Sequence, residues 1–171
     1  MHINKKRQYF LKFIMACSIQ VLFTTIANAQ INTKRTYPKD SLVKVQIIDP
    51  FEHSAEQRGE TPNWDELNKQ ITAQFDAAFA ERLVNKAQIY YDYGKDWPAF
   101  TAALVRYTEK YEDHNNLRLL NYNAGMVLKF STDQKELEAA LAWCKYTIDK
   151  EPTNADYQKT YETLKAKVPG K

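Results

Sequence analysis

The chain has 171 residues, with 24 basic and 21 acidic side chains, four glycines and two cysteines. This length suits one globular domain. Scarce glycine and plentiful aromatic residues favour packed helices over a turn-rich β fold. The net charge of +3 gives no case for nucleic acid as a partner, because the excess of basic residues lies in the first 29 positions.

Residues 1–29 have the order of a cleavable secretory signal. An uncharged apolar run over 13–26 precedes Ala27-Asn28-Ala29, which supplies the small side chains of a cleavage site. The positive start before this run consists of Lys5, Lys6, Arg7 and Lys12. The run is shorter than the roughly 20 residues of a membrane span. We predict export to the periplasm or the extracellular space, recognition of Ala27 and Ala29 by signal peptidase, and no membrane span after cleavage.

A lipoprotein signal is the alternative. Residues 14–17 resemble a lipobox, whose cysteine, here Cys17, would be lipidated and become the new N-terminus. Lys12 interrupts the apolar stretch just before this site, and the apolar run continues to Ile26, where a lipoprotein normally has a polar tether. These two features favour cleavage after Ala29.

Cleavage there leaves 142 residues, of which 20 are basic and 21 acidic. The mature chain is therefore nearly neutral. Cys144 is then its one cysteine, so it contains no C-x-x-C motif and no internal disulfide. A domain in an oxidising compartment without disulfides depends on its hydrophobic core for stability.

Residues 30–62 predict an extended arm and loop. Residues 42–48 alternate in part and contain β-branched side chains, which indicates one strand ending at Asp49-Pro50. A single strand without a partner is not stable alone, so we expect it to pack on the helices. The polar residues 53–62, with Gly59 and Pro62, predict a loop.

A helical domain over 63–171 follows. Apolar side chains recur every three or four residues, which is the helical period. Asn63 predicts an N-cap, and 65–92 reads as one long helix or two with a break, ended by Gly94. Asp96 begins the next helix, and Thr132 or Asp133 begins a later one. The remaining predicted helices span 117–130 and 155–167.

An internal repeat relates two parts of this domain at an offset of 37 residues. Residues 87–111 superimpose without a gap on 124–148, and Asp96 then matches Asp133. Residues 102–104 match 139–141, both Ala-Ala-Leu. Each unit reads as helix, short turn, helix. The repeat predicts an all-α fold of antiparallel helical hairpins that bury their apolar faces on one another.

The second unit resembles the tetratricopeptide repeat at Ala140, Cys144 and Pro152. Ala124 and Leu128 stand where that family has tryptophan and glycine, so the resemblance is to a degenerate repeat. It implies a short solenoid in which the first helix of each pair lines a concave face.

A second resemblance covers about 100 of the 142 mature residues. Residues 95–100, 104–108 and 140–143 are similar to the helical C-terminal region of secreted bacterial thioredoxin-like proteins. This likeness implies a helical, repeat-like fold in the cell envelope. The thioredoxin domain itself is missing, and no position matches its catalytic cysteines, so redox activity does not carry over.

No residue pattern predicts catalysis, a metal site or a cofactor. Cys144 aligns with Tyr107 on an apolar stripe and is expected to be an inert core thiol. His53 and His114 stand alone in predicted loops, without metal-ligand spacing. We therefore predict a protein that is not an enzyme.

Two groups of residues could form a binding surface. Tyr90, Tyr91 and Tyr93 with Trp97 form the densest aromatic cluster; we expect it to pack in the core, with a recognition surface as the alternative. In the tetratricopeptide register, the groove residues would be Asn85, Gln88, Asp92, Tyr122 and Lys129.

These observations predict an exported helical-repeat module that binds protein or peptide in the cell envelope. One alternative is an accessory to envelope thiol-disulfide exchange, which uses Cys144 or partners a separate thioredoxin-like protein. The other alternative is a structural envelope protein without a defined ligand.

Overall fold

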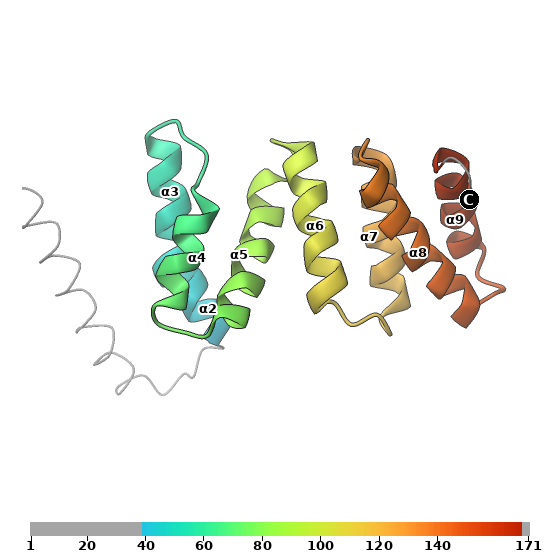
Figure 1. The fold of residues 1–171 in the computed structure, drawn as a ribbon, viewed down its shortest axis with the longest axis horizontal. Coiled ribbons are helices and arrows are strands. Elements are labelled where there is room, and N and C mark those ends of the chain that lie inside the picture. Colours follow the sequence, from blue (N-terminus) through green and yellow to red (C-terminus); the bar gives the residue numbers. More distant parts are fainter. Residues whose placement is uncertain (1–38, 169–171) are drawn as a thin grey trace, which may run out of the picture. The chain divides into compact units, whose positions relative to one another are not determined.

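The computed structural model describes residues 39–168, and from Asp40 onward it forms one compact unit. Figure 1 shows the helices following one another in chain order, each beside the next. They are α2 (Lys39–Val43), η1 (Lys44–Ile48), α3 (Asp49–Gln57), α4 (Trp64–Thr72), α5 (Ala77–Asp92), α6 (Trp97–Tyr111), α7 (Leu117–Phe130), α8 (Gln134–Lys150) and α9 (Ala155–Lys167). The predicted all-α class is confirmed. The predicted signal, with Ala27, Ala29 and Cys17, lies outside the described residues.

The extended arm predicted over 30–62 is wrong where the structure describes it, because residues 39–57 are helical. A strand over 42–48 would bury alternate side chains. Instead Val43 and Ile48 are buried while Val45 is 64% exposed, which is a helical pattern. Pro50 has no N–H to donate four residues back. The chain accommodates it with the π-helical turn η1, closed by the Asp49 N–H on the Lys44 carbonyl.

Each helix from α4 onward begins at an Asn or Asp whose side chain accepts a hydrogen bond from the first turn. These caps are Asn63, Asp76, Asp96, Asn116, Asp133 and Asn154. Such caps satisfy N–H groups that have no partner within the helix. The predicted segment 65–92 is two helices because Asp76 starts α5. Of the two residues proposed as the cap of α8, Asp133 fills the role.

Gly94 closes the turn between α5 and α6. Its φ is +77°, and the Lys95 N–H donates to the Asp92 carbonyl at 2.9 Å. Tyr93 has φ −57° and ψ 119°. These values define a type II turn, whose third residue must take a positive φ, which glycine adopts without steric cost. The turn brings α6 back antiparallel to α5.

The helices pack as hairpins that also contact the next pair. α5 packs on α6 and α7 on α8, while α6 also contacts α8 and α7 also contacts α9. The start of α6 at Trp97 and the start of α8 at Gln134 reproduce the offset of the sequence repeat. The antiparallel helical hairpins predicted from the sequence are therefore present.

Two hydrophobic clusters hold this arrangement. The first joins η1, α4 and α5 through residues such as Ile48, Leu67 and Leu83. The second joins α6, α7, α8 and α9 around Val127, Trp143 and Leu164. α5 contributes to both, since Leu83 lies in the first and Ile89 packs on the second. α5 is therefore the helix that links the two cores.

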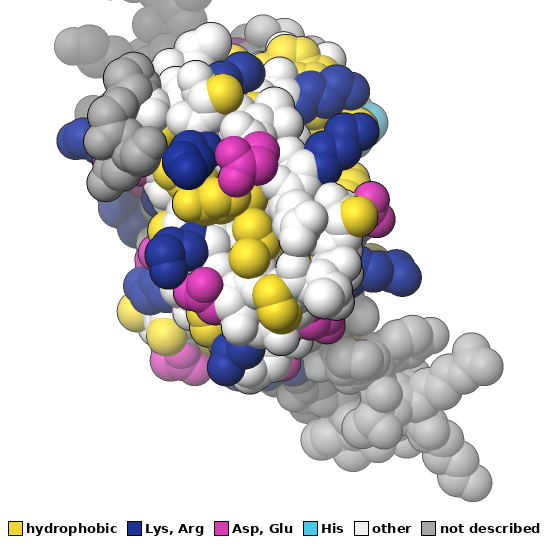
Figure 2. Space-filling model, turned by 90° about the vertical axis from the view of Figure 1, so that its right-hand side faces the viewer, with side chains coloured by type: hydrophobic (Ala, Val, Ile, Leu, Met, Phe, Trp, Pro, Cys, Tyr) yellow, Lys and Arg dark blue, Asp and Glu magenta, His cyan; other side chains and the backbone are white. Residues whose placement is uncertain are grey.

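The last helix closes the second core with a polar outer surface. α9 buries Tyr157 and Leu164, whereas Lys159, Lys165 and Lys167 are exposed. Figure 2 looks onto this side, the right-hand side of Figure 1, and shows lysine and arginine side chains surrounding the hydrophobic ones.

Candidate binding groove

A groove of about 450 Å³ lies between α5 and α7, with α6 contributing to its lining. Its lining is mostly apolar and aromatic, as is usual in ligand-binding clefts. We call it the tyrosine groove. The lining residues are Lys86, Ile89, Tyr90, Tyr93, Phe100, Leu104, Tyr107, Glu112, Leu119, Tyr122, Asn123 and Met126.

Three of its tyrosines are open to solvent. Tyr90 is 70% exposed, Tyr122 60% and Tyr93 55%. Among the described residues the one other large hydrophobic side chain exposed to this degree is Val45. Exposed aromatic side chains gathered in one groove indicate a contact surface, whereas single ones scattered over a protein do not.

Helical spacing explains why these residues share a groove. On α5 the lining residues stand at 86, 89, 90 and 93, and on α7 at 119, 122, 123 and 126. Steps of three and four residues place side chains on one face of a helix. α7 packs directly on α9, but the corresponding space between α5 and α7 remains open as the groove. The exposed tyrosines Tyr90 and Tyr93 lie on the α5 side of this open space, and Tyr122 lies on the α7 side.

Hydrogen bonds fix the floor of the groove. The Asn123 Nδ2 donates to the Thr108 Oγ1 at 3.0 Å, and both residues are buried. A ring nitrogen of His114 lies 3.0 Å from the Thr108 carbonyl oxygen, within hydrogen-bond distance. His114 is thus a positioning residue between α6 and α7. Two charged side chains, Lys86 and Glu112, line the otherwise uncharged groove.

Tyr93 and Phe100, which line the groove, contact further aromatic rings outside its lining. Trp97 and Phe130 stack face to face, with centroids 3.7 Å apart and planes 6° from parallel. Tyr93 meets both Trp97 and Phe100 edge to face at 5.4 Å. Edge-to-face contacts restrain a ring and leave its other face open to a partner. Tyr93 is therefore held in place although it is exposed.

Three residues predicted for the groove face another way. Asn85 is buried, and its Oδ1 accepts a hydrogen bond from the Arg106 Nε at 3.1 Å. The Gln88 Oε1 accepts one from the Arg106 guanidinium at 2.9 Å. Asp92 is 3% exposed, and burial raises the pKa of its carboxyl group. Asn85 and Gln88 join α5 to α6, and none of the three lines the tyrosine groove.

Of the other two predicted residues, one lines the groove and one does not. Tyr122 lines the groove, whereas Lys129 is exposed with its ammonium 4.8 Å from the Phe130 ring centroid, outside the groove lining. On α5 the lining is displaced by one position from the predicted stripe, which is a rotation of about 100° around the helix axis. Lys86 and Ile89 were missed for this reason, and Tyr90 was named only in the aromatic cluster, with a recognition surface as the alternative. Their spacing was readable, but which face of α5 stays uncovered was not.

The residues of the aromatic cluster also lie in different surroundings. Core packing, the expected role, is wrong for Tyr90 and Tyr93, which are exposed. Tyr91 is half-buried, meets Trp64 edge to face at 5.5 Å, and has the Lys95 ammonium 3.8 Å from its ring centroid. Neighbouring tyrosines on one helix thus serve different surfaces.

The expected inert thiol agrees with the surroundings of Cys144. The side chain is fully buried, and desolvation raises its pKa to about 12. A thiol with such a pKa is not ionised at neutral pH, and the thiolate is the reactive form. Within residues 39–168, no three His, Cys, Asp or Glu side chains gather in a way that could hold a metal ion.

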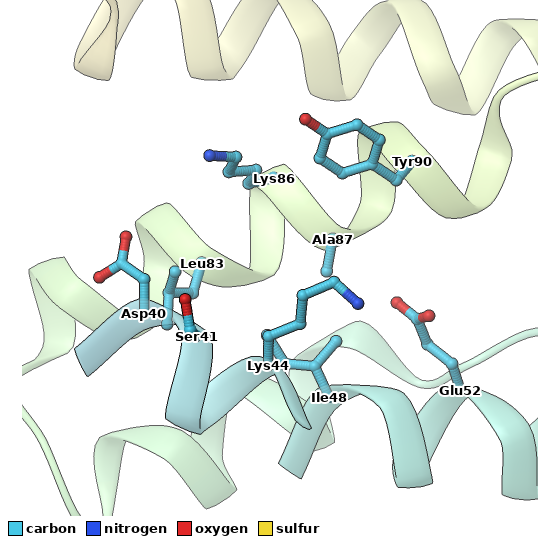
Figure 3. Close-up of a pocket in the computed structure, with 9 residues that line it drawn as sticks. All are labelled: Asp40, Ser41, Lys44, Ile48, Glu52, Leu83, Lys86, Ala87 and Tyr90. Atoms are coloured by element: carbon cyan, nitrogen blue, oxygen red, sulfur yellow. The ribbon is translucent and has the colours of Figure 1, made fainter. Parts of the chain in front are cut away.

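Two further hollows adjoin the tyrosine groove. One, of about 200 Å³, lies between α5 and the segment α2–α3 and shares Lys86 and Tyr90 with the groove. Figure 3 shows its lining residues. The other lies between α7 and α9 and shares Tyr122. The face formed by α5, α7 and α9 is therefore hollowed along its length.

No protein-family model, curated protein or solved structure matches the chain. The functional argument therefore rests on the groove itself. None of the described helices has the length and apolar character to cross a membrane.

Proposed function

We propose that this protein is an exported helical-repeat module that binds an extended segment of a protein or peptide in the tyrosine groove. The observation that carries the proposal is the gathering of Tyr90, Tyr93 and Tyr122, all more than half exposed, in one groove of about 450 Å³. Tyrosine gives a large contact area and a hydroxyl at little cost in conformational entropy, so it is favoured in protein interfaces.

The form of the groove supports a chain-like partner over a compact one. It continues into neighbouring hollows on both sides, through Tyr90 toward α2–α3 and through Tyr122 toward α9. An extended peptide can lie along such a path and place successive side chains in it. The deep burial of Cys144 supports a binding role over thiol exchange at that residue.

A peptide-display library tests the proposal, with the chain lacking residues 1–29 as the target. Peptides selected on this protein should bind it saturably. The double variant Tyr90→Ala/Tyr122→Ala should weaken that binding by about 10- to 100-fold, because exposed aromatic anchors carry much of an interface's energy. Isothermal titration calorimetry measures both affinities.

Val45→Ala is the matched control, since Val45 is similarly exposed but lines none of the three hollows. It should leave affinity unchanged. Circular dichroism should show that all variants fold alike. Equal binding by the wild type and the double variant would exclude the groove as the peptide site.

A further inference from the structure

The hollow between α5 and α2–α3 has the composition of a small-ligand site. α5 supplies Leu83, Lys86, Ala87 and Tyr90, while α2, η1 and α3 supply Asp40, Ser41, Lys44, Ile48 and Glu52. Ile48 and Leu83 are 4% exposed and Ala87 8%, so they form a nearly dry apolar floor. Polar and charged groups stand above this floor. Such a combination binds small molecules that have one apolar and one charged end.

Some charged groups around the hollow already have an ion-pair partner, and others do not. Arg82 engages Asp40 through two hydrogen bonds of 2.8 Å. The Lys44 ammonium pairs with Asp49. Within residues 39–168 no acidic side chain forms an ion pair with Lys86. Figure 3 shows Lys86 and Tyr90 both projecting from α5, on the side of that helix away from Lys44 and Ile48 in this view.

Glu52 carries less negative charge than its position suggests. Its pKa is raised to about 7; burial has the largest effect, Asp49 and Glu56 also raise the pKa, and Lys44 and Lys95 oppose them. Near neutral pH about half of the Glu52 side chains are therefore protonated. Among the described residues that line the hollow, Lys86 is then the fully charged side chain without an ion-pair partner, so the hollow favours an anion.

We propose that this hollow binds a short aliphatic carboxylate, with its carboxylate on the Lys86 ammonium and the Tyr90 hydroxyl and its alkyl group on Ile48, Leu83 and Ala87. The volume of about 200 Å³ has room for a ligand the size of one amino acid. Two sources share this chemistry: a free small carboxylate, and the C-terminal residue of a peptide. This inference goes beyond peptide binding in the tyrosine groove and does not depend on it.

Calorimetric titration of the chain lacking residues 1–29 tests the site with matched probes. Isovalerate and N-acetyl-leucine should bind, whereas isovaleramide and N-acetyl-leucinamide should bind at least about tenfold more weakly, because they lack the charge. A peptide ending in leucine distinguishes the sources. Tighter binding of the peptide acid than of N-acetyl-leucine identifies a chain terminus, and equal binding identifies a free carboxylate; both results support the site.

Substitutions test whether the carboxylate binds in this hollow. Lys86→Met should reduce carboxylate affinity at least about tenfold, and Ser41→Trp should block the hollow from the exposed rim. Lys135→Met, on the distant α8, should not change it. Affinity should also fall as pH rises through about 7, because ionised Glu52 would repel the ligand. Equal binding of acids and amides, no saturable binding, or an unchanged affinity in Lys86→Met would overturn the proposal.

Discussion

The hairpins α5–α6 and α7–α8 repeat one backbone arrangement at an offset of 37 residues, yet different kinds of side-chain contact stabilise them. Their inner positions match closely: Ala103 and Ala140 are both fully buried, and Leu104 and Leu141 are 6% and 7% exposed. Outside this shared centre, an equivalent position makes hydrogen bonds within the first hairpin but packs in the core in the second. The repeat therefore preserves the spacing of helices more strictly than the surfaces between them.

Position 106 and its repeat equivalent, 143, show the contrast. Arg106 is exposed and bonds Asn85 and Gln88 on α5. Trp143 is 3% exposed, and its Nε1–H donates to Glu109 of α6 at 2.6 Å. The Arg106 contacts hold α6 to the helix before it in its own hairpin. The tryptophan instead fills the core between successive hairpins.

Positions 90 and 127 show what the difference does to the solvent-exposed surface. Val127 is fully buried, and its equivalent Tyr90 is 70% exposed. α7 has α9 packed against it, while α5 faces the open groove. The same helical register thus makes a core residue in one unit and a groove residue in the other.

The largest effect is expected at position 143. Trp143→Ala should lower the free energy of unfolding by about 3–5 kcal/mol, because it leaves a large cavity in the core. Arg106→Met, its counterpart, should cost only about 1 kcal/mol, the value of hydrogen bonds lost near the surface. Urea unfolding followed by circular dichroism measures both. Similar losses at the two positions would show that the hairpins are closed in the same way.

A smaller effect is expected at the pair 127 and 90. Val127→Ala should destabilise the fold by about 2 kcal/mol through lost burial and a small cavity. Tyr90→Ala should change stability by less than about 0.5 kcal/mol, because an exposed side chain has little packing to lose. The same urea titrations apply. A strongly destabilised Tyr90→Ala would mean that Tyr90 belongs to the core and is unavailable to a partner.

The smallest effect is the pH dependence of stability that Glu52 on α3 introduces. Folding raises the pKa of Glu52 from 4.5 to about 7, so the folded state holds a proton that the unfolded state releases. This stabilisation is fully present below about pH 4.5 and is lost as pH rises through about 7. We expect a loss of about 1 kcal/mol, since the group is partly screened by solvent.

Glu52→Gln should remove this pH dependence, while Glu138→Gln on the exposed surface of α8 should retain it. Thermal melts between pH 5 and 8 provide the comparison. Asp92, whose pKa burial also raises, adds a dependence of the same sign. A melting temperature of wild type that rises with pH across neutrality would contradict the assignment to Glu52.

Much of the helical domain was readable before the structure. Asn63, Asp96 and Asn154 mark helix starts because their side chains satisfy the first N–H groups of a helix, a purely local effect. The segment 39–57 was not readable. Its β-branched residues and Pro50 indicate a strand by local preference, but burial against α4 and α5 makes it a helix with a π turn.

The candidate site was only partly readable. Tyr122 was identified, but Asn85 and Gln88 were assigned to the groove although Arg106 occupies them. Helical spacing shows which residues share a face. It does not show which face of a helix meets a neighbour.

The sequence by itself determined the spacing of the repeated hairpins and the helices from Asp96 onward, because caps, turns and apolar periodicity act over a few residues. Only the tertiary structure decided that Val127 is core and Tyr90 is groove. That choice depends on which neighbouring helices surround the position: Val127 packs in the core shared by α6, α7, α8 and α9, whereas Tyr90 lines the groove.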